Sequence, residues 1–179
     1  MIKRIHTKIR IIWFKHIKKL HKKIVVLIYD FDGVMTDNKV LLSQDGIELV
    51  QVTRADGLGV DMIRNLGIKQ MILSTETNPV VGKRAEKLRI DAVTGCKDKK
   101  EYIDSYCAKE GITFENVLYV GNDLNDLEAM QNAGFSLAPK DAHPLIRKTA
   151  DLVTCAKGGQ GVIKELAEWL VGEYKWLKK

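Results

Sequence analysis

The chain has 179 residues, 45% of them apolar and 29% charged, which is the composition of a single globular domain with a sizeable core. No apolar run approaches the roughly 20 residues of a membrane-spanning helix, so we do not expect an integral membrane protein. The net charge of +6 comes from residues 1–23, which hold nine Lys and Arg and no Asp or Glu, whereas residues 24–179 have a net charge of −3. The body of the chain is therefore not expected to bind nucleic acid.

Residues 1–23 are expected to form a basic amphipathic helix that precedes the main domain at residues 24–179. Apolar residues recur there mostly every three or four positions, with Lys and Arg between them. Such a helix could pack on the body or on a second subunit, lie on an anionic membrane surface, or extend loosely. Basic residues interrupt the apolar stretch throughout, which is not the pattern of a secretory signal. Three cysteines without metal or redox spacing favour a reduced, cytoplasmic setting.

The first predicted strand, Ile24–Tyr29, ends in two carboxylates. Its β-branched composition is typical of a strand buried on both faces, and Asp30-Phe31-Asp32-Gly33 follows it directly. Ligands of open α/β sheets bind at the carboxyl ends of the strands. Asp30 is thus a candidate nucleophile and Asp32 a candidate proton shuttle, although an acidic turn would have the same sequence.

Strands and helices alternate along the rest of the chain. A β-hairpin is predicted at about 39–52, with Asp45-Gly46 in its turn, and a helix follows that Asp56 would N-cap and Gly67 would end. Further strands are predicted at 69–73, 91–93, 117–120, 135–138 and 152–153, and helices at 79–88, 99–110, 123–133, 144–149 and 162–176. This alternation predicts an α/β fold, a three-layer Rossmann-like parallel sheet with a small hairpin insertion and no cap domain.

Further polar residues lie at the predicted ends of later strands. Ser74 follows the strand at 69–73, and Lys99 begins the helix after the strand at 91–93. Gly121-Asn122-Asp123-Leu124-Asn125-Asp126 follows the next strand and offers oxygen ligands for Mg²⁺, a hard cation. Each of these motifs alone has an ordinary structural explanation, as a strand-end hydroxyl, a solvated lysine or a helix cap.

Taken in order, the four motifs resemble those of the haloacid dehalogenase superfamily of phosphotransferases, over about residues 24–170. The resemblance implies that Asp30 attacks phosphorus to give an aspartyl-phosphate and that Asp32 moves protons. It assigns Ser74 and Lys99 to the phosphoryl oxygens. It also implies a Mg²⁺ site with Asp30, the Asp32 carbonyl, Asp123 and Asn122 as candidate ligands and Asp126 behind them. Many members have Asp at the position of Asn122, so the direct ligand stays open between Asn122 and Asp123.

The short hairpin and the lack of a cap are similar to the small-insert subfamily typified by 3-deoxy-manno-octulosonate (KDO) 8-phosphate phosphatase. That resemblance implies a homotetramer in which a neighbouring subunit closes each site. The segment 157–161, Lys-Gly-Gly-Gln-Gly, would contribute to this closure, or is simply a loop before the last helix.

Glu76 decides which substrate the resemblance favours. The KDO branch has Arg at this place, whereas Glu resembles the branch that acts on nine-carbon acids, 2-keto-3-deoxynononate (KDN) 9-phosphate and N-acylneuraminate 9-phosphate, in acidic-sugar biosynthesis. Arg84 and Arg54 are candidate partners of the sugar carboxylate, or are solvated surface charges, and Lys87 could balance Glu76. The full set of candidate substrate-binding residues is Gly33, Thr53, Arg54, Asp56, Gly57, Thr75, Glu76, Arg84 and Lys87.

Two alternatives to a nine-carbon phosphatase stay open. One is a KDO 8-phosphate phosphatase with the same mechanism. The other is a non-catalytic module of the same fold, associated with a sialic-acid cytidylyltransferase. The presence of Asp30, Asp32, Ser74 and Lys99 together favours an enzyme.

Overall fold

The computed structural model describes residues 23–172, and within them the predicted α/β fold is confirmed. A six-stranded parallel sheet has the order β5-β4-β1-β6-β7-β8. The strands are β1 (Val26–Tyr29), β4 (Lys69–Leu73), β5 (Asp91–Val93), β6 (Val117–Val120), β7 (Phe135–Ala138) and β8 (Leu152–Val153). Apart from the hairpin, this part of the chain has no inserted domain over the sheet, as predicted.

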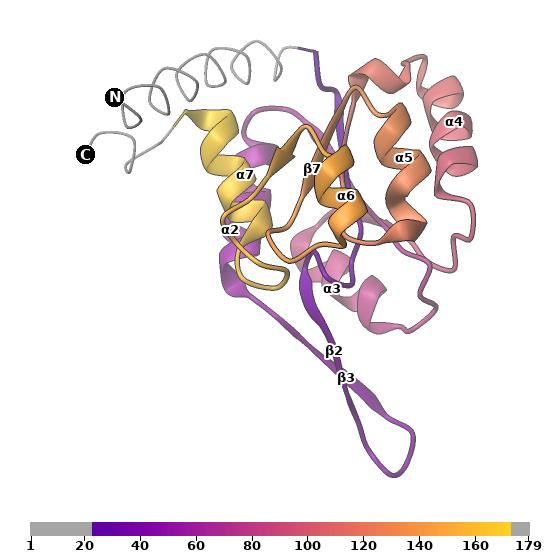
Figure 1. Cartoon of the computed structure of the whole chain (residues 1–179), viewed down its shortest axis with the longest axis vertical. Helices are drawn as coiled ribbons and strands as arrows, with labels where there is room; N and C mark the ends of the chain where they lie inside the picture. The colour runs from indigo at the N-terminus through magenta and orange to yellow at the C-terminus, as the bar shows by residue number, and fades with distance from the viewer. Residues whose placement is uncertain (1–22, 173–179) are drawn as a thin grey trace.

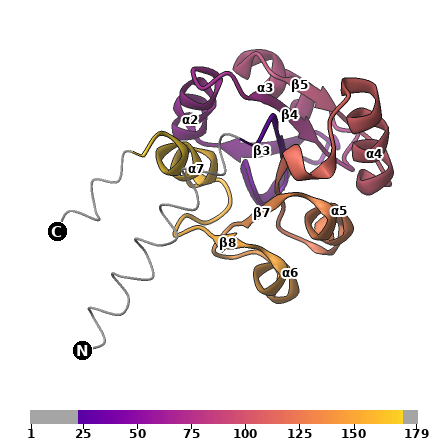
Figure 2. The same cartoon turned by 90° about the horizontal axis from the view of Figure 1, so that it is seen from above.

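Helices cover both faces of the sheet and make two apolar cores (Figure 2). Leu27 and Tyr29 of β1 point to one face, and Val26 and Ile28 point to the other, because side chains alternate along a strand. The first core is completed by α2 (Arg54–Arg64), α3 (Val80–Leu88) and α7 (Val162–Val171). The second is completed by α4 (Lys99–Glu110), α5 (Leu127–Asn132) and α6 (Pro144–Thr149).

The strand order reverses beside β1, and this reversal places the site. β1 pairs with β4 on one side and with β6 on the other, and Tyr29 lies level with both Ile72 and Val120. The carboxyl ends of the three strands therefore meet at the same height. Such a switch point is where open α/β sheets bind their ligands.

The hairpin consists of β2 (Thr36–Leu42) and β3 (Glu48–Val52) and projects from the body (Figure 1). Its pairing register shifts between Thr36 and Val40, and Asn38 in this bulge has a positive φ of 61°. A bulge turns the strand and redirects its side chains.

Several details differ from the sequence-based prediction, among them the start of β2 at Thr36 rather than at about residue 39. Thr53, not Asp56, is the N-cap of α2, with its hydroxyl accepting from Ala55 N at 3.2 Å. Asp56 instead lies within the first turn of α2 and accepts from Ile163 N of α7 at 2.9 Å. A short 3₁₀-helix, η2 (Leu124–Asp126), precedes α5 where one continuous helix was predicted.

The predicted helix at residues 1–23 and the last part of the helix predicted to reach residue 176 lie outside the described residues. No helix between residues 23 and 172 has the length and apolarity required to cross a bilayer.

Gly59 allows α2 and α7 to pack closely. A Cβ atom at this position would lie 2.7 Å from the backbone of Ile163, and backbone cannot yield as a flexible side chain can. Gly82, in α3, has no atom within 4 Å of its hypothetical Cβ and is exposed. The two glycines therefore make a matched pair.

We expect Gly59→Ala to lower the free energy of unfolding by about 1–3 kcal/mol, because the two helices must move apart. Gly82→Ala is expected to raise it by about 0.5–1 kcal/mol, through lower backbone entropy in the unfolded chain. Urea denaturation of both variants measures the difference. Equal effects of the two substitutions would contradict the close packing of α2 on α7.

Candidate active site

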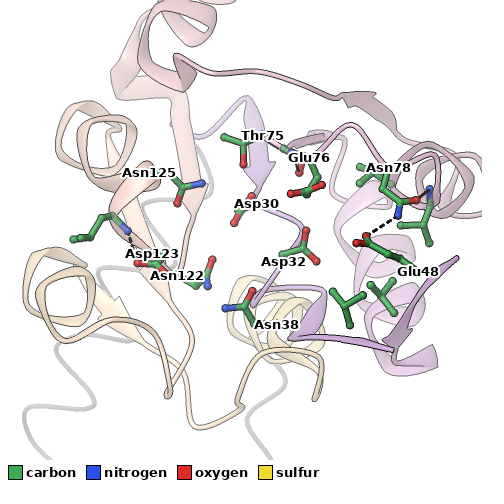
Figure 3. A pocket seen from close by; sticks show the side chains of 16 residues that line it. Asp30, Asp32, Asn38, Glu48, Thr75, Glu76, Asn78, Asn122, Asp123 and Asn125 are labelled. Carbon is green, nitrogen blue, oxygen red and sulfur yellow. Dashed lines mark hydrogen bonds between the residues drawn. The ribbon is translucent and has the colours of Figure 1, made fainter. Parts of the chain in front are cut away.

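A cavity of about 500 Å³ opens at the carboxyl ends of the central strands, beside residues of the hairpin (Figure 3). Asp30 and Asp32 lie at its centre, between the loop after β4 and the loop after β6. The hairpin contributes one wall, in which Glu48 accepts a hydrogen bond from Asn78 Nδ2 at 3.2 Å. The lining residues are Asp30, Asp32, Asn38, Val40, Glu48, Val50, Ser74, Thr75, Glu76, Asn78, Val80, Val81, Asn122, Asp123, Leu124 and Asn125.

Lys99 links the loop after β1 to the loop after β6 through two buried carboxylates. Its ammonium donates to Asp30 Oδ1 at 2.8 Å and to Asp126 Oδ1 at 2.7 Å, and all three side chains are almost completely buried. Burial alone would lower the pKa of Lys99, but the two carboxylates outweigh this effect and raise it. Lys99 is therefore a fixed positive charge at the base of the site.

The two motif aspartates differ in their surroundings. Burial, with the nearby Asp126 charge, raises the pKa of Asp30 to about 7, although Lys99 opposes the shift. Burial also raises the pKa of Asp32, and this shift is opposed by a hydrogen bond from Thr36 Oγ1 at 3.1 Å. Asp32 is half-buried, so it can exchange protons with a bound molecule.

Ser74 lies at the end of β4 with its hydroxyl at the cavity. Its backbone N–H bonds to Val93 O at 2.9 Å, and its Oγ accepts from the N–H of Glu76 at 3.0 Å. The hydroxyl proton is thereby directed away from Glu76 N and is available as a donor to a ligand. Thr75 and Glu76 continue this wall of the cavity.

The loop after β6 presents one oxygen atom without a partner. Asn122 Oδ1 is buried and has no hydrogen bond, although Asn122 lines the cavity. Asp123, by contrast, is exposed, and its Oδ1 caps η2 by accepting from Leu124 N at 2.7 Å. The Asn122 amide packs directly against Gly33, where only a residue without a side chain leaves room for it, since a Cβ at Gly33 would lie 2.0 Å from Asn122 Nδ2.

The cavity is acidic, and no Lys, Arg or His lies among the described residues that line it. No cluster of three His, Cys, Asp or Glu side chains suited to a metal ion occurs within residues 23–172. Carboxylates alone therefore do not make a cation site here. The unpartnered Asn122 oxygen between Asp30, Asp32 and Asp123 is the group that fits a hard cation, which takes amide and carboxylate oxygens together.

The segment at 157–161 packs against the first motif of its own chain. Gly159 N donates to Val34 O at 3.0 Å, and a Cβ at Gly158 would lie 2.2 Å from Gly33 O. Asp141 Oδ1 accepts from Gly158 N at 2.9 Å and holds the segment from the other side. Within one chain this segment therefore braces the loop that carries Asp32.

Several predicted substrate-binding residues are not brought to this cavity. Arg54, Gly57, Arg84 and Lys87 line a second cavity of about 310 Å³, between α2 and α3. Arg84 is only 9% exposed and donates to Thr53 O at 2.8 Å. Asp56 is fully buried under α7, and Thr53 serves as a helix cap. Of the predicted set, Thr75 and Glu76 line the cavity with the catalytic candidates.

Asn38, Glu48 and Tyr119 are among the residues of this site that were not predicted from the sequence. Asn38 and Glu48 line the cavity. Glu48 lies within the predicted hairpin at 39–52, whereas Asn38 lies just before it, because β2 begins at Thr36. Tyr119 of β6 donates to Asp126 Oδ1 at 2.8 Å. Its signal was a tyrosine in an otherwise aliphatic buried strand, Val-Leu-Tyr-Val, two residues before Gly121.

A family model and a curated protein both match most of the residues described above. The model of the haloacid dehalogenase-like hydrolase family matches residues 66–166, which include Ser74, Lys99 and the loop after β6. The KDO 8-phosphate phosphatase of Salmonella typhi is 33% identical over 157 residues, covering 87% of this chain and 84% of that protein.

Two solved structures superpose closely on this chain. A haloacid dehalogenase family protein from Streptomyces avermitilis has a TM-score of 0.83 and 44% identity, over 85% of this chain and 87% of that one. The Moraxella catarrhalis KDO 8-phosphate phosphatase, solved with magnesium, phosphate and KDO, has a TM-score of 0.84 and 27% identity, over 91% and 94%.

We expect Lys99→Met to lower the free energy of unfolding by about 3–5 kcal/mol near pH 7.5, because it leaves two buried carboxylates without their cation. Lys100→Met is the control, since the neighbouring Lys100 forms a solvent-exposed pair with Asp104 that water screens, so its loss should change stability little. Denaturant unfolding of both variants, measured without metal, gives the comparison.

The loss in Lys99→Met should shrink between pH 7 and pH 5. A carboxyl group whose pKa is raised on folding, as that of Asp30 already is, binds a proton more tightly in the folded state, so the fold gains stability as the pH falls. A pH-independent loss, or equal losses for the two lysines, would contradict the buried bridge.

Proposed function

This chain belongs to the haloacid dehalogenase-like hydrolase family and is a phosphoric monoester hydrolase, and we propose that it hydrolyses the phosphate ester of a 2-keto-3-deoxy sugar acid with the help of Mg²⁺. The observation that carries the proposal is the buried bridge of Lys99 between Asp30 and Asp126, directly under the cavity that also contains Asp32 and Ser74. The same arrangement argues against a non-catalytic assembly module.

Asp30 is the proposed nucleophile. A carboxylate oxygen of Asp30 attacks phosphorus, the bond from phosphorus to the sugar oxygen breaks, and an aspartyl-phosphate forms. Lys99 orients this carboxylate and opposes the rise of its pKa, and the third N–H of Lys99 is assigned to a phosphoryl oxygen. The Ser74 hydroxyl donates to another phosphoryl oxygen as charge builds there.

Asp32 is the proposed proton shuttle. Its raised pKa allows it to hold a proton that it gives to the departing sugar oxygen. It then takes a proton from the water that attacks phosphorus, which releases phosphate and restores Asp30. Thr36 fixes one oxygen of Asp32 during both steps.

Asp30, the Asp32 carbonyl and Asn122 are proposed to hold Mg²⁺, with Asp123 at the edge of the site and Asp126 behind it. A bound Mg²⁺ would offset the repulsion between the Asp30 carboxylate and the phosphate dianion. The buried, unpartnered Asn122 oxygen supports Asn122 over Asp123 as the direct ligand.

Glu76 supports a nine-carbon substrate, KDN 9-phosphate or N-acylneuraminate 9-phosphate. Its side chain is at the cavity wall, where it can accept hydrogen bonds from sugar hydroxyls but cannot pair with a carboxylate. KDO 8-phosphate is the second candidate, because relatives of this chain carry that activity in their names.

We further propose that the working form is a homotetramer in which neighbouring copies close the open side of the cavity. The hairpin exposes five large apolar side chains to at least half of their full extent, and a projecting two-stranded ribbon is marginal in water. Those side chains are Val40, Leu41, Leu42, Ile47 and Leu49. In such an assembly Arg54 and Arg84, which line the second cavity, are the candidates to meet a neighbour's sugar carboxylate. A monomeric mass by light scattering at micromolar concentration would contradict the assembly.

The substrate proposal is tested by phosphate release with Mg²⁺ from KDN 9-phosphate, N-acetylneuraminate 9-phosphate and KDO 8-phosphate. We expect a nine-carbon ester to have the highest kcat/KM and Asp30→Asn to abolish release. Glu76→Arg should lower kcat/KM for the nine-carbon esters by about tenfold or more, through loss of a polar contact to the sugar. Preference for KDO 8-phosphate would keep the chemistry and refute the interpretation of Glu76, and no release from any ester would refute the phosphatase.

The metal proposal is tested by Mg²⁺ titration monitored by calorimetry. Asn122→Ala should weaken Mg²⁺ binding by about 10–100-fold, whereas Asp123→Ala should weaken it only severalfold. Because burial raises the pKa of Asp30 to about 7, Mg²⁺ must displace a proton below that pH, and the apparent affinity should fall about tenfold per pH unit there. Equal losses in the two variants would refute Asn122 as the direct ligand.

A further inference from the structure

Asp126 is held on both of its carboxylate oxygens. Oδ1 accepts from the Tyr119 hydroxyl at 2.8 Å and from Lys99 Nζ at 2.7 Å. Oδ2 accepts from the backbone N–H of Asn122 at 2.8 Å and of Asp123 at 3.3 Å. Asp126 and Tyr119 are both fully buried, so no solvent molecule can replace a missing donor without entering the core.

The direction of the last N–H of Lys99 depends on this arrangement. A lysine ammonium has three donors, and two of them point at Asp30 Oδ1 and Asp126 Oδ1. The angles between the three N–H bonds are fixed by the tetrahedral nitrogen. The positions of the two carboxylate oxygens therefore determine where the third donor points, and this is the donor that the proposed reaction uses.

We propose that Tyr119 is a positioning residue for phosphoryl transfer, because its hydroxyl fixes Asp126 and thereby aims the third N–H of Lys99 at the phosphoryl group. This inference rests on the proposed function, which assigns that N–H to a phosphoryl oxygen. Tyr119 itself, a residue of β6, belongs to the apolar core that α4, α5 and α6 complete, and it is not among the residues that line the cavity.

Removal of the Tyr119 hydroxyl changes how the Lys99 ammonium is shared between Asp30 and Asp126. In Tyr119→Phe, Asp126 Oδ1 keeps Lys99 as its one side-chain donor, so the ammonium is drawn toward Asp126 and turns with respect to Asp30. The substitution should therefore weaken binding of the transition state more than binding of the substrate. The reason is that the phosphoryl oxygens reach the geometry that the third N–H of Lys99 is aimed at only in the transition state.

Tyr29 provides a matched control. It is also a fully buried tyrosine at the centre of the sheet, and its hydroxyl donates to Gln70 Oε1 at 2.7 Å. It lies on the adjacent strand β1 but on the opposite face, in the other apolar core. Tyr29→Phe therefore removes the same group and a similar hydrogen bond without touching the bridge of Lys99.

The test compares the full-length wild type, Tyr119→Phe and Tyr29→Phe, each with Mg²⁺. For each protein we would measure kcat and KM for the best ester of the panel and for p-nitrophenyl phosphate. Inhibition constants would be measured for orthovanadate, which adopts the trigonal bipyramid of the transition state, and for inorganic phosphate. Denaturant unfolding would show whether the two variants lose comparable stability.

We expect Tyr119→Phe to lower kcat about tenfold and to raise the vanadate inhibition constant about tenfold, with KM and the phosphate constant within about twofold of the wild type. Tyr29→Phe should leave all four quantities within about twofold. The ratio of the vanadate and phosphate constants does not depend on the fraction of folded enzyme, so it separates positioning from simple destabilisation.

Equal kinetic effects of the two substitutions would overturn the inference, as would vanadate and phosphate constants that rise together. Both results leave the proposed function intact, because the wild type is then still an active phosphatase. A wild type that releases phosphate from no ester would refute the proposed function and the inference with it.

Discussion

The site depends on one buried cation shared by two buried carboxylates. Lys99 donates to Asp30 and Asp126, which come from the ends of different strands, so the bridge fixes the loop after β1 against the loop after β6. Two carboxylates this close and this deep repel each other, and burial disfavours the charge of each. The arrangement is stable because Tyr119 and two backbone N–H groups also bind Asp126. Burial and, after it, the Asp126 charge raise the pKa of Asp30, although Lys99 opposes the shift.

The cavity above this bridge is lined, within residues 23–172, by negative but not by positive side chains, and it is open on one side. Its described lining contains carboxylates and amides but no cation, and the hairpin that forms one wall exposes apolar side chains to solvent. An anionic ester can bind there only with added positive charge, from a metal ion and from groups outside the cavity. The proposed Mg²⁺, held by Asn122 among others, would supply positive charge inside the cavity. The proposed neighbouring copies would cover the apolar side chains of the hairpin and close the open side.

The motifs were predictable because Asp30, Ser74 and the loop that ends at Asp126 follow β1, β4 and β6, and parallel strands align their carboxyl ends. Where the alternation of strands and helices is correct, these motifs lie at one edge of the sheet, and Lys99 was correctly placed at the start of α4. Arg84 and Arg54 were less predictable, because they lie on helices, where one residue of rotation changes the direction of a side chain by about 100°. Arg84 turns toward Thr53 and a second cavity rather than toward Glu76. Asp56 caps α7, more than a hundred residues away, instead of its own helix.

The sequence by itself determined the fold class, the strand ends and the four motifs, because periodicity, strand composition and motif spacing are local properties of the chain. Tertiary structure alone decided which of these groups touch. The choice of Asn122 over Asp123 as the unpartnered oxygen follows from the cap that Asp123 makes on η2. The hydrogen bond of Tyr119, the brace of Gly158 and Gly159 on the first motif and the separate cavity of Arg84 all join residues distant in sequence. Such contacts depend on packing between layers, and hydrophobic pattern and spacing do not specify them.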